Sequence, residues 1–286
     1  MVEWVKCTLK PLIRFFRKEI TVKDALLVLQ ENCPAVLYIF TFLFGVSVGS
    51  FLNVCIYRIP EQQSIVTVPS HCMSCGKKLH WYELIPLFSW IFLRGKCHGC
   101  KAKISAQYPI VEACNGLLWC LVLFMKGISW DTLLLWALFS ALFVMGFIDA
   151  RTMEIPNGIV IFILVLAVIR AALQIFLYKA GWLDYVLGPV IMGGVFFAIL
   201  LLTEGRAMGG GDVKLMFAIG LFLGLKLTLF GLVAACAVGS VIHLTLMAVK
   251  KVGRQLAFGP YLAIGFAISA LWGNYFMDWY FGRFFG

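Results

Sequence analysis

The sequence predicts an all-α integral membrane protein of about eight transmembrane helices, with a long cytoplasmic loop between the first and the second. Two observations predict this fold class. Of the 286 residues, 62% are hydrophobic and only 13% are charged, and a soluble protein could not cover so many apolar side chains. The apolar residues also form long runs that are separated by polar connections, which is typical of helices that cross a bilayer.

Eight apolar runs follow one another and each predicts a helix. They cover residues 34–57, 108–125, 132–148, 155–178, 183–203, 213–225, 227–249 and 258–281. All but the sixth are long enough to cross about 30 Å of hydrocarbon at 1.5 Å per residue. The sixth and seventh must be separate, since one helix over both would run about 55 Å. We expect the short sixth helix to begin slightly below the membrane surface.

The first 33 residues differ from the rest of the chain because basic and apolar side chains alternate in them. This pattern fits an amphipathic helix lying on a membrane surface, and fits a solvated basic tail equally well. We expect no cleavable signal peptide, because the first long apolar run begins only at residue 34. The predicted organisation is a surface segment (1–33), a first membrane helix (34–57), a loop (58–107) and a seven-helix membrane domain (108–286).

Basic residues are distributed unequally between the two sides of the predicted bundle. The connections after the first, third, fifth and seventh runs carry thirteen Lys and Arg, against four on the other side when residues 1–33 are left out. The positive-inside rule therefore places the loop 58–107 in the cytoplasm. The same distribution argues against a nucleic-acid partner in spite of the net charge of +10, and membrane lipid is the expected surrounding.

The long loop contains two Cys-x-x-Cys pairs, formed by Cys72 with Cys75 and by Cys97 with Cys100. The 21 residues between the pairs are close to the zinc-ribbon spacing of roughly 15–20. Four thiolates satisfy tetrahedral Zn²⁺, and a cytoplasmic loop is kept reduced. The spacing predicts a structural zinc knuckle, with a metal-free thiol cluster or redox switch as the alternative.

Two aspartates stand at the ends of apolar runs that otherwise lack acids. Asp149 closes the third run, and Asp212 follows three glycines and opens the sixth. A carboxylate costs roughly 2.5–3.5 kcal/mol at the centre of a membrane helix and less near its ends, so such residues usually have a function. Both fall on the cytoplasmic side, where a pair of carboxylates could activate water. For Asp212 alone, a helix N-cap is an equally good interpretation. Three further acids fall on the same side: Glu112, Glu154 and Glu204.

Several longer motifs, taken together and in order, resemble those of the type IV prepilin peptidases, which are GxGD aspartyl proteases. They are GSFLNV (49–54) with RIP (58–60), the four loop cysteines, ELIPLFSWIFLRGKC (83–97), SAQYPIVE (105–112), FIDARTMEIPN (147–157), GGGDVKL (209–215) and FGPYLAIG (258–265). Gln107 departs from the resemblance, since the family usually has arginine there. Residues 1–33 lie outside it.

The resemblance implies a bifunctional enzyme of the bacterial cytoplasmic (inner) membrane, with its active site facing the cytoplasm. Such an enzyme cleaves the short basic leader of a type IV prepilin or pseudopilin, with Asp149 and Asp212 as the catalytic pair. It then methylates the new N-terminal amine with S-adenosyl-L-methionine. By position and motif match, the loop 58–107 and Glu112 are the candidates for the methyltransferase part. Glu112 could instead pair with Lys101, Lys103 or Arg94. A peptidase without methyltransferase activity stays the alternative function.

Overall fold

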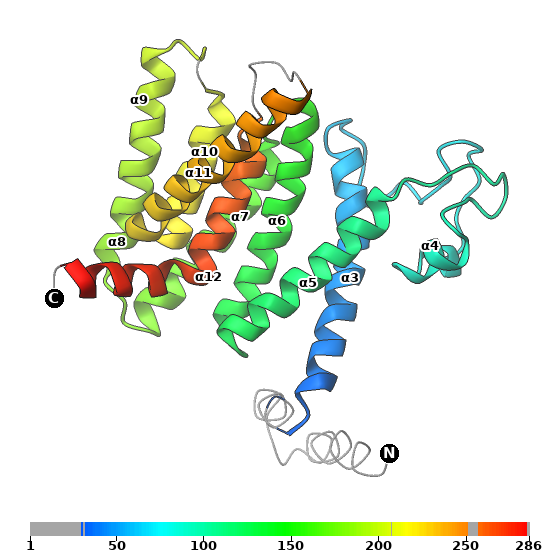
Figure 1. Cartoon of the computed structure of the whole chain (residues 1–286), viewed down its shortest axis with the longest axis horizontal. Helices are drawn as coiled ribbons and strands as arrows, with labels where there is room; N and C mark the ends of the chain where they lie inside the picture. Colours follow the sequence, from blue (N-terminus) through cyan, green and yellow to red (C-terminus); the bar gives the residue numbers. More distant parts are fainter. Residues whose placement is uncertain (1–29, 31, 207, 251–256, 285–286) are drawn as a thin grey trace. The chain divides into compact units, whose positions relative to one another are not determined.

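The computed structural model describes residues 30, 32–206, 208–250 and 257–284, so the predicted surface segment 1–33 lies almost entirely outside the described residues. The described chain is helical apart from turns and two isolated β-bridges. The elements are α3 (Pro34–Arg58), η1 (Trp81–Leu84), α4 (Phe88–Phe92), α5 (Gln107–Lys126), α6 (Trp130–Thr152), α7 (Asn157–Phe176), α8 (Trp182–Leu187), η2 (Gly188–Gly193), α9 (Gly194–Leu202), α10 (Gly210–Leu223), α11 (Leu225–Lys250) and α12 (Gly259–Phe284) (Figure 1).

Six helices in the described part of the chain are long and apolar enough to cross a membrane, namely α3, α5, α6, α7, the continuous stretch from α8 to α9, and α11. The prediction of an all-helical protein with several membrane-spanning helices is confirmed, and the count of eight spans is not confirmed. The sixth predicted span is the helix α10, whose 14 residues reach only about 21 Å. The eighth is the helix α12, which has the length but carries Asn274, Asp278 and Arg283 in its second half.

The chain divides into two compact units, one made of Met1–Val54 with Ser64–Trp136 and the other of Cys55–Gln63 with Ala137–Gly286. In the first unit, α3 and α5 approach each other closely because small residues line their contact. A Cβ atom on Gly45 would lie only 2.8 Å from the Cα atom of Gly116. The side-chain amide of Asn115, which is fully buried, donates a 2.7 Å hydrogen bond to the carbonyl oxygen of Gly45. Small residues with a polar anchor are the usual contact between membrane helices.

In the second unit, α10 is surrounded by α7, η2 and α9. The six-residue element η2 is a π-helical turn at the place where α10 comes closest. A Cβ atom on Gly220 of α10 would lie 2.7 Å from the carbonyl group of Gly188, so only glycine fits at this crossing. The helices α11 and α12 pack along each other (Figure 1), and Gly265 allows the approach because a Cβ there would lie 2.6 Å from Ala235.

The far end of α10 is held by a buried cation. The guanidinium of Arg170, in α7, donates a hydrogen bond to the carbonyl oxygen of Phe222 and lies 4.8 Å from the centre of the Phe222 ring. A helix leaves its last carbonyl groups without internal partners, and a cation there complements the helix dipole. The helix then ends at Gly224, whose φ of +81° suits glycine.

Candidate active site and metal centre

Asp149 lies in a buried position near the end of α6. The sequence predicts that this helix ends at residue 148, just before Asp149. The helix instead continues to Thr152 and stops where Met153 takes a φ of 55°. The Asp149 residue is only 5% exposed. One of its carboxylate oxygens, Oδ2, accepts a 2.8 Å hydrogen bond from the backbone N–H of Gly259, at the start of α12. A buried carboxylate needs such a partner, because burial removes its hydrogen bonds to water.

Asp212 lies in the first turn of α10. The N-cap of this helix is Gly209, so the prediction that Asp212 might itself be the N-cap residue is wrong. The aspartate instead occupies the third helical position, and its carboxylate accepts a hydrogen bond from the backbone of Gly209. A carboxylate that reaches back from this position satisfies one of the free N–H groups at a helix start.

The two aspartates are brought together by the turn that joins α6 to α7. A Cβ atom on Gly211 would lie 2.9 Å from Cβ of Ile155 in that turn, so the glycine run lets the start of α10 rest against it. The two carboxylates are close enough for the charge of Asp149 to act on Asp212. Two other acids of this unit do not join them: Glu154 is exposed, and Glu204 forms a 2.9 Å ion pair with Arg206 at the surface.

Gly259 is a site residue that reasoning from the sequence missed. A Cβ atom in its place would lie 2.7 Å from Oδ2 of Asp149 and 2.9 Å from its carboxyl carbon, so any other residue would collide with the carboxylate. The neighbouring Pro260 covers Gly146, one turn before Asp149, with its Cα atom 3.3 Å from where a Cβ would be. The only sequence signal was the motif FGPYLAIG, which was noted without a role.

The four loop cysteines form a cluster in the first unit. The Sγ atoms of Cys72, Cys75, Cys97 and Cys100 all lie within 4.8 Å of one another, and those of Cys72 and Cys100 are 3.8 Å apart. Tetrahedral zinc with Zn–S bonds of about 2.3 Å separates its sulfur ligands by about 3.8 Å. The arrangement of the donors therefore fits one Zn²⁺ ion.

The two cysteine pairs sit in turns of the same construction. In the first turn, the N–H of Gly76 donates to the carbonyl of Cys72 (2.8 Å), and in the second the N–H of Lys101 donates to that of Cys97 (3.0 Å). Gly76 and Lys101 both have positive φ, 69° and 60°. Each turn is closed by a β-bridge, between residues 71 and 78 and between residues 96 and 103. Two matched knuckles that present their thiols to one point are what a structural zinc site requires.

The surroundings of the cluster favour the thiolate form of one cysteine. Hydrogen bonds from the backbone N–H groups of Ser74 and Cys75 lower the pKa of the Cys72 thiol to about 6. Metal ions bind thiolates rather than thiols, so the lowered pKa of Cys72 favours the form of the side chain that binds a metal.

Glu83 supports the first knuckle and was not identified from the sequence. Its carboxylate accepts a 2.7 Å hydrogen bond from the backbone N–H of His80 and lies 3.6 Å from the ammonium of Lys77. This hydrogen bond and the charge of Lys77 lower the pKa of Glu83. The carboxylate therefore stays ionised and ties η1 to the residues that follow Cys75.

Glu112 lies at the contact between α5 and the loop. It is 6% exposed, and its Oε2 accepts a 2.8 Å hydrogen bond from the backbone N–H of Leu87; the side chain of Ser50 also hydrogen-bonds to it. Leu87 has a φ of 61° just before α4, a conformation that costs energy in a residue other than glycine. Glu112 thus holds the start of α4 in place. Among the described residues, it forms no ion pair with Lys101, Lys103 or Arg94.

Comparison with known proteins adds to this geometry. Residues 43–126, with the cysteine cluster and Glu112, match the family model of the bacterial peptidase A24 N-terminal domain. Residues 136–244, with both aspartates, match that of the type IV leader peptidase family. No solved structure matches the chain.

Several relatives match the chain over most of their length. The chain is 32% identical to the prepilin leader peptidase/N-methyltransferase of Aeromonas salmonicida (strain A449), over 89% of this chain and 97% of that protein. It is 30% identical to the protein of the same name from Pseudomonas aeruginosa (84% and 92%), and 32% identical to that of Xanthomonas campestris pv. campestris (82% and 91%). With two family models in order and relatives matched over nearly their full length, the chain belongs to the type IV leader peptidase family.

Proposed function

We propose that this protein cleaves the leader of a type IV prepilin or pseudopilin by an aspartyl mechanism and then N-methylates the new N-terminal residue. The observation that carries the peptidase part is that Asp149, in the last turn of α6, and Asp212, in the first turn of α10, lie close enough for one charge to act on the other. The methyltransferase part is supported by relatives whose names include both activities and which the chain matches over most of their length.

The two carboxylates divide the chemistry of hydrolysis between them. Two adjacent carboxylates do not both ionise easily, so the pair shares one proton. The ionised member takes a proton from water as the oxygen attacks the scissile carbonyl, and the protonated member donates a hydrogen bond to the carbonyl oxygen. The leaving nitrogen then takes the proton that the carboxylate had removed from water, as the C–N bond breaks. Gly259 keeps Oδ2 of Asp149 engaged throughout, which leaves Oδ1 for water.

Zn²⁺ in the cysteine cluster would have a structural role. Four cysteine ligands fill its coordination and leave no open position for water, unlike a catalytic zinc site. Cys72, Cys75, Cys97 and Cys100 would hold it, and the ion would fix the two knuckles to each other.

For methyl transfer we propose that Glu112 acts through the segment that it positions. Its Oε2 is already bonded to Leu87, so it orders the start of α4 beside the metal-binding knuckles in the first unit. S-adenosyl-L-methionine, when bound, supplies an electrophilic methyl group to the free, deprotonated N-terminal amine. The protein's own task is to bring that amine and the donor together and to keep the amine unprotonated.

We further propose that the protein lies in the bacterial inner membrane with both aspartates and the loop 58–107 on the cytoplasmic side. The excess of Lys and Arg in these connections supports this orientation. A cysteine substituted for Thr67, an exposed residue of the loop outside the cysteine cluster, should then react with a membrane-impermeant thiol reagent only after lysis. Labelling in intact cells would show that the orientation is the reverse of the one proposed.

One experiment tests both activities together. Purified protein in detergent is incubated with a model prepilin and labelled S-adenosyl-L-methionine, and mass spectrometry follows the loss of the leader and the gain of a methyl group. Both products support the proposal. Cleavage without methylation identifies a peptidase-only member of the family, and no cleavage in folded, zinc-loaded protein contradicts the proposal as a whole.

A further inference from the structure

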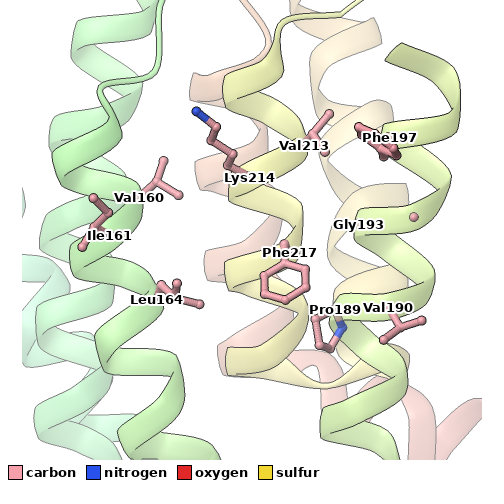
Figure 2. A pocket seen from close by; sticks show the side chains of 11 residues that line it. Val160, Ile161, Leu164, Pro189, Val190, Gly193, Phe197, Val213, Lys214 and Phe217 are labelled. Carbon is pink, nitrogen blue, oxygen red and sulfur yellow. The ribbon is translucent and has the colours of Figure 1, made fainter. Parts of the chain in front are cut away.

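An apolar recess of about 470 Å³ begins beside Asp212. Figure 2 shows that it lies over α10, with α7 on one side and η2 and α9 on the other, and that Lys214 stands at one end of it and Pro189 near the other. Val213 and Lys214, the two residues after Asp212, form part of its wall, and Phe217 lies one turn further along α10. The recess therefore begins within one helical turn of Asp212.

The hollow exists because the wall formed by η2 and α9 has little side-chain volume at its middle. Gly193 and Gly194 both line it. A Cβ atom on Gly193 would touch the ring of Phe217 at 3.2 Å, whereas one on Gly194 would meet no atom within 4 Å. From Pro189 to Phe197, the wall covers eight residues, or about 12 Å of helix. This length matches about two turns of a helix lying in the recess.

The charge at the end near Asp212 limits what can lie there. The ammonium of Lys214 donates a 2.9 Å hydrogen bond to the neutral side-chain amide of Asn157, and no carboxylate in the described part of the chain forms an ion pair with it. A basic segment would be repelled by this uncompensated cation. An apolar segment would bury its side chains against Ile161, Phe197 and Phe217 with no such penalty.

We propose that this recess binds the first two turns of the apolar helix that follows the scissile bond of the substrate. The inference rests on the proposed peptidase function and adds a binding site to it. The substrate chain would pass Asp149 and Asp212 with its basic leader directed away from Lys214. Its apolar residues would then run along α10, between α7 and α9. A lipid acyl chain is the competing occupant of such a surface in a bilayer.

The first test fills the recess without disturbing the protein. Gly194→Phe introduces a large side chain at a lining position where a Cβ atom meets nothing within 4 Å, and Gly282→Phe in α12 is the matched control, since a Cβ there also meets nothing within 4 Å. We expect Gly194→Phe to lower kcat/KM for full-length prepilin by about tenfold or more, mainly through KM, because apolar pockets commonly discriminate on this scale. Gly282→Phe should leave it within about twofold.

A second substrate separates this proposal from the proposed function. A short peptide that spans the cleavage junction but lacks the apolar helix should be cut equally by wild type and by Gly194→Phe. If wild type cuts prepilin and Gly194→Phe cuts it just as well, the recess does not bind the substrate. If wild type cuts neither substrate, the peptidase function itself is wrong.

A photocrosslink identifies the occupant directly. Phe197 is replaced by p-benzoylphenylalanine in the Asp149→Asn protein, so that prepilin is bound and not cut, and Phe176, an exposed residue of α7 outside the recess, is the control position. We expect adducts from position 197 to fall within about eight residues after the scissile bond, with few from position 176. Adducts to lipid only, to the leader, or equally from both positions would overturn the proposal.

Discussion

The backbone N–H of Gly259 holds Oδ2 of Asp149 at 2.8 Å across 110 residues of sequence. A Cβ atom on Gly259 would lie 2.7 Å from that same oxygen. Gly259→Ala should therefore displace the carboxylate and lower prepilin cleavage by about 10²-fold, the scale on which a 1 Å misplacement reduces a rate. Gly282→Ala, where a Cβ meets nothing within 4 Å, is the control. Equal cleavage rates for the two variants would show that the contact does not matter.

Replacing either aspartate with its amide should abolish cleavage. Asp149→Asn and Asp212→Asn each remove one of the two carboxyl groups that share a proton. Loss of one member of a catalytic pair commonly lowers the rate by about 10³-fold or more. Glu154→Gln removes an exposed acid five residues beyond Asp149, and should leave cleavage nearly unchanged. The measurement is leader loss by mass spectrometry on folded protein in detergent. Near wild-type cleavage by either amide variant would rule out the aspartyl mechanism.

The purified protein should contain about one zinc ion per chain. Cys72→Ser should lower the zinc content, and should make the loop more sensitive to protease, because small metal sites fold with their metal. Cys236→Ser, at an exposed cysteine of α11 that is outside the cluster, should change neither. Elemental analysis gives the zinc content and limited proteolysis the state of the loop. An active, reduced protein without zinc would contradict this prediction.

The reactivity of Cys72 should report its lowered pKa when zinc has been removed. A thiolate reacts with iodoacetamide and a thiol does not. With a pKa of about 6, Cys72 should stay reactive at pH 7 and lose half its rate only as the pH falls to about 6. The same cysteine in denatured protein should lose half its rate near pH 8.5. Mass spectrometry of the alkylated peptide over a pH series gives both profiles, and coincident profiles would mean that the turn does not stabilise the thiolate once zinc has been removed.

Glu112→Gln should separate the two activities. The substitution replaces the charged carboxylate that accepts the hydrogen bond from Leu87 with a neutral amide. Loss of a hydrogen bond to a charged group changes an equilibrium constant by roughly tenfold. We expect methylation of an already cleaved pilin to fall by about that factor, while leader cleavage stays within about twofold. Asp149→Asn and Asp212→Asn should show the opposite pattern. An equal fall in both products for every variant would place the loop in the peptidase reaction.

The features that the sequence predicts well are local or chemically unusual. The Cys-x-x-Cys spacing predicts the cluster because each knuckle is built from consecutive residues. An acid beside an apolar run is rare enough to single out Asp149 and Asp212, and the structure brings the two together, while their catalytic role stays a prediction. The same reasoning applied to Arg170, a lone cation inside an apolar run, would have indicated the buried contact with Phe222.

Other features leave no side-chain signal. Gly259 acts through its backbone N–H, which every residue but proline has, and its partner is far away in sequence. Hydropathy also cannot tell a span from a helix that packs mainly on its neighbours, so the sequence of α10 predicts a short span while its 14 residues pack on α7, η2 and α9. Glu112 and Glu83 both accept backbone N–H groups from the loop, and the fold of that loop was not predicted.

The contact between Gly188 and Gly220 fixes the rotation of α10 about its axis and its position along that axis. Asp212 lies eight residues before Gly220, or about 12 Å along the helix. One residue inserted between them would turn the aspartate by about 100° about the helix axis and shift it by about 1.5 Å, while the glycine crossing stayed where it is. The spacing between the two positions should therefore tolerate neither insertion nor deletion, even where the individual side chains between them can be exchanged.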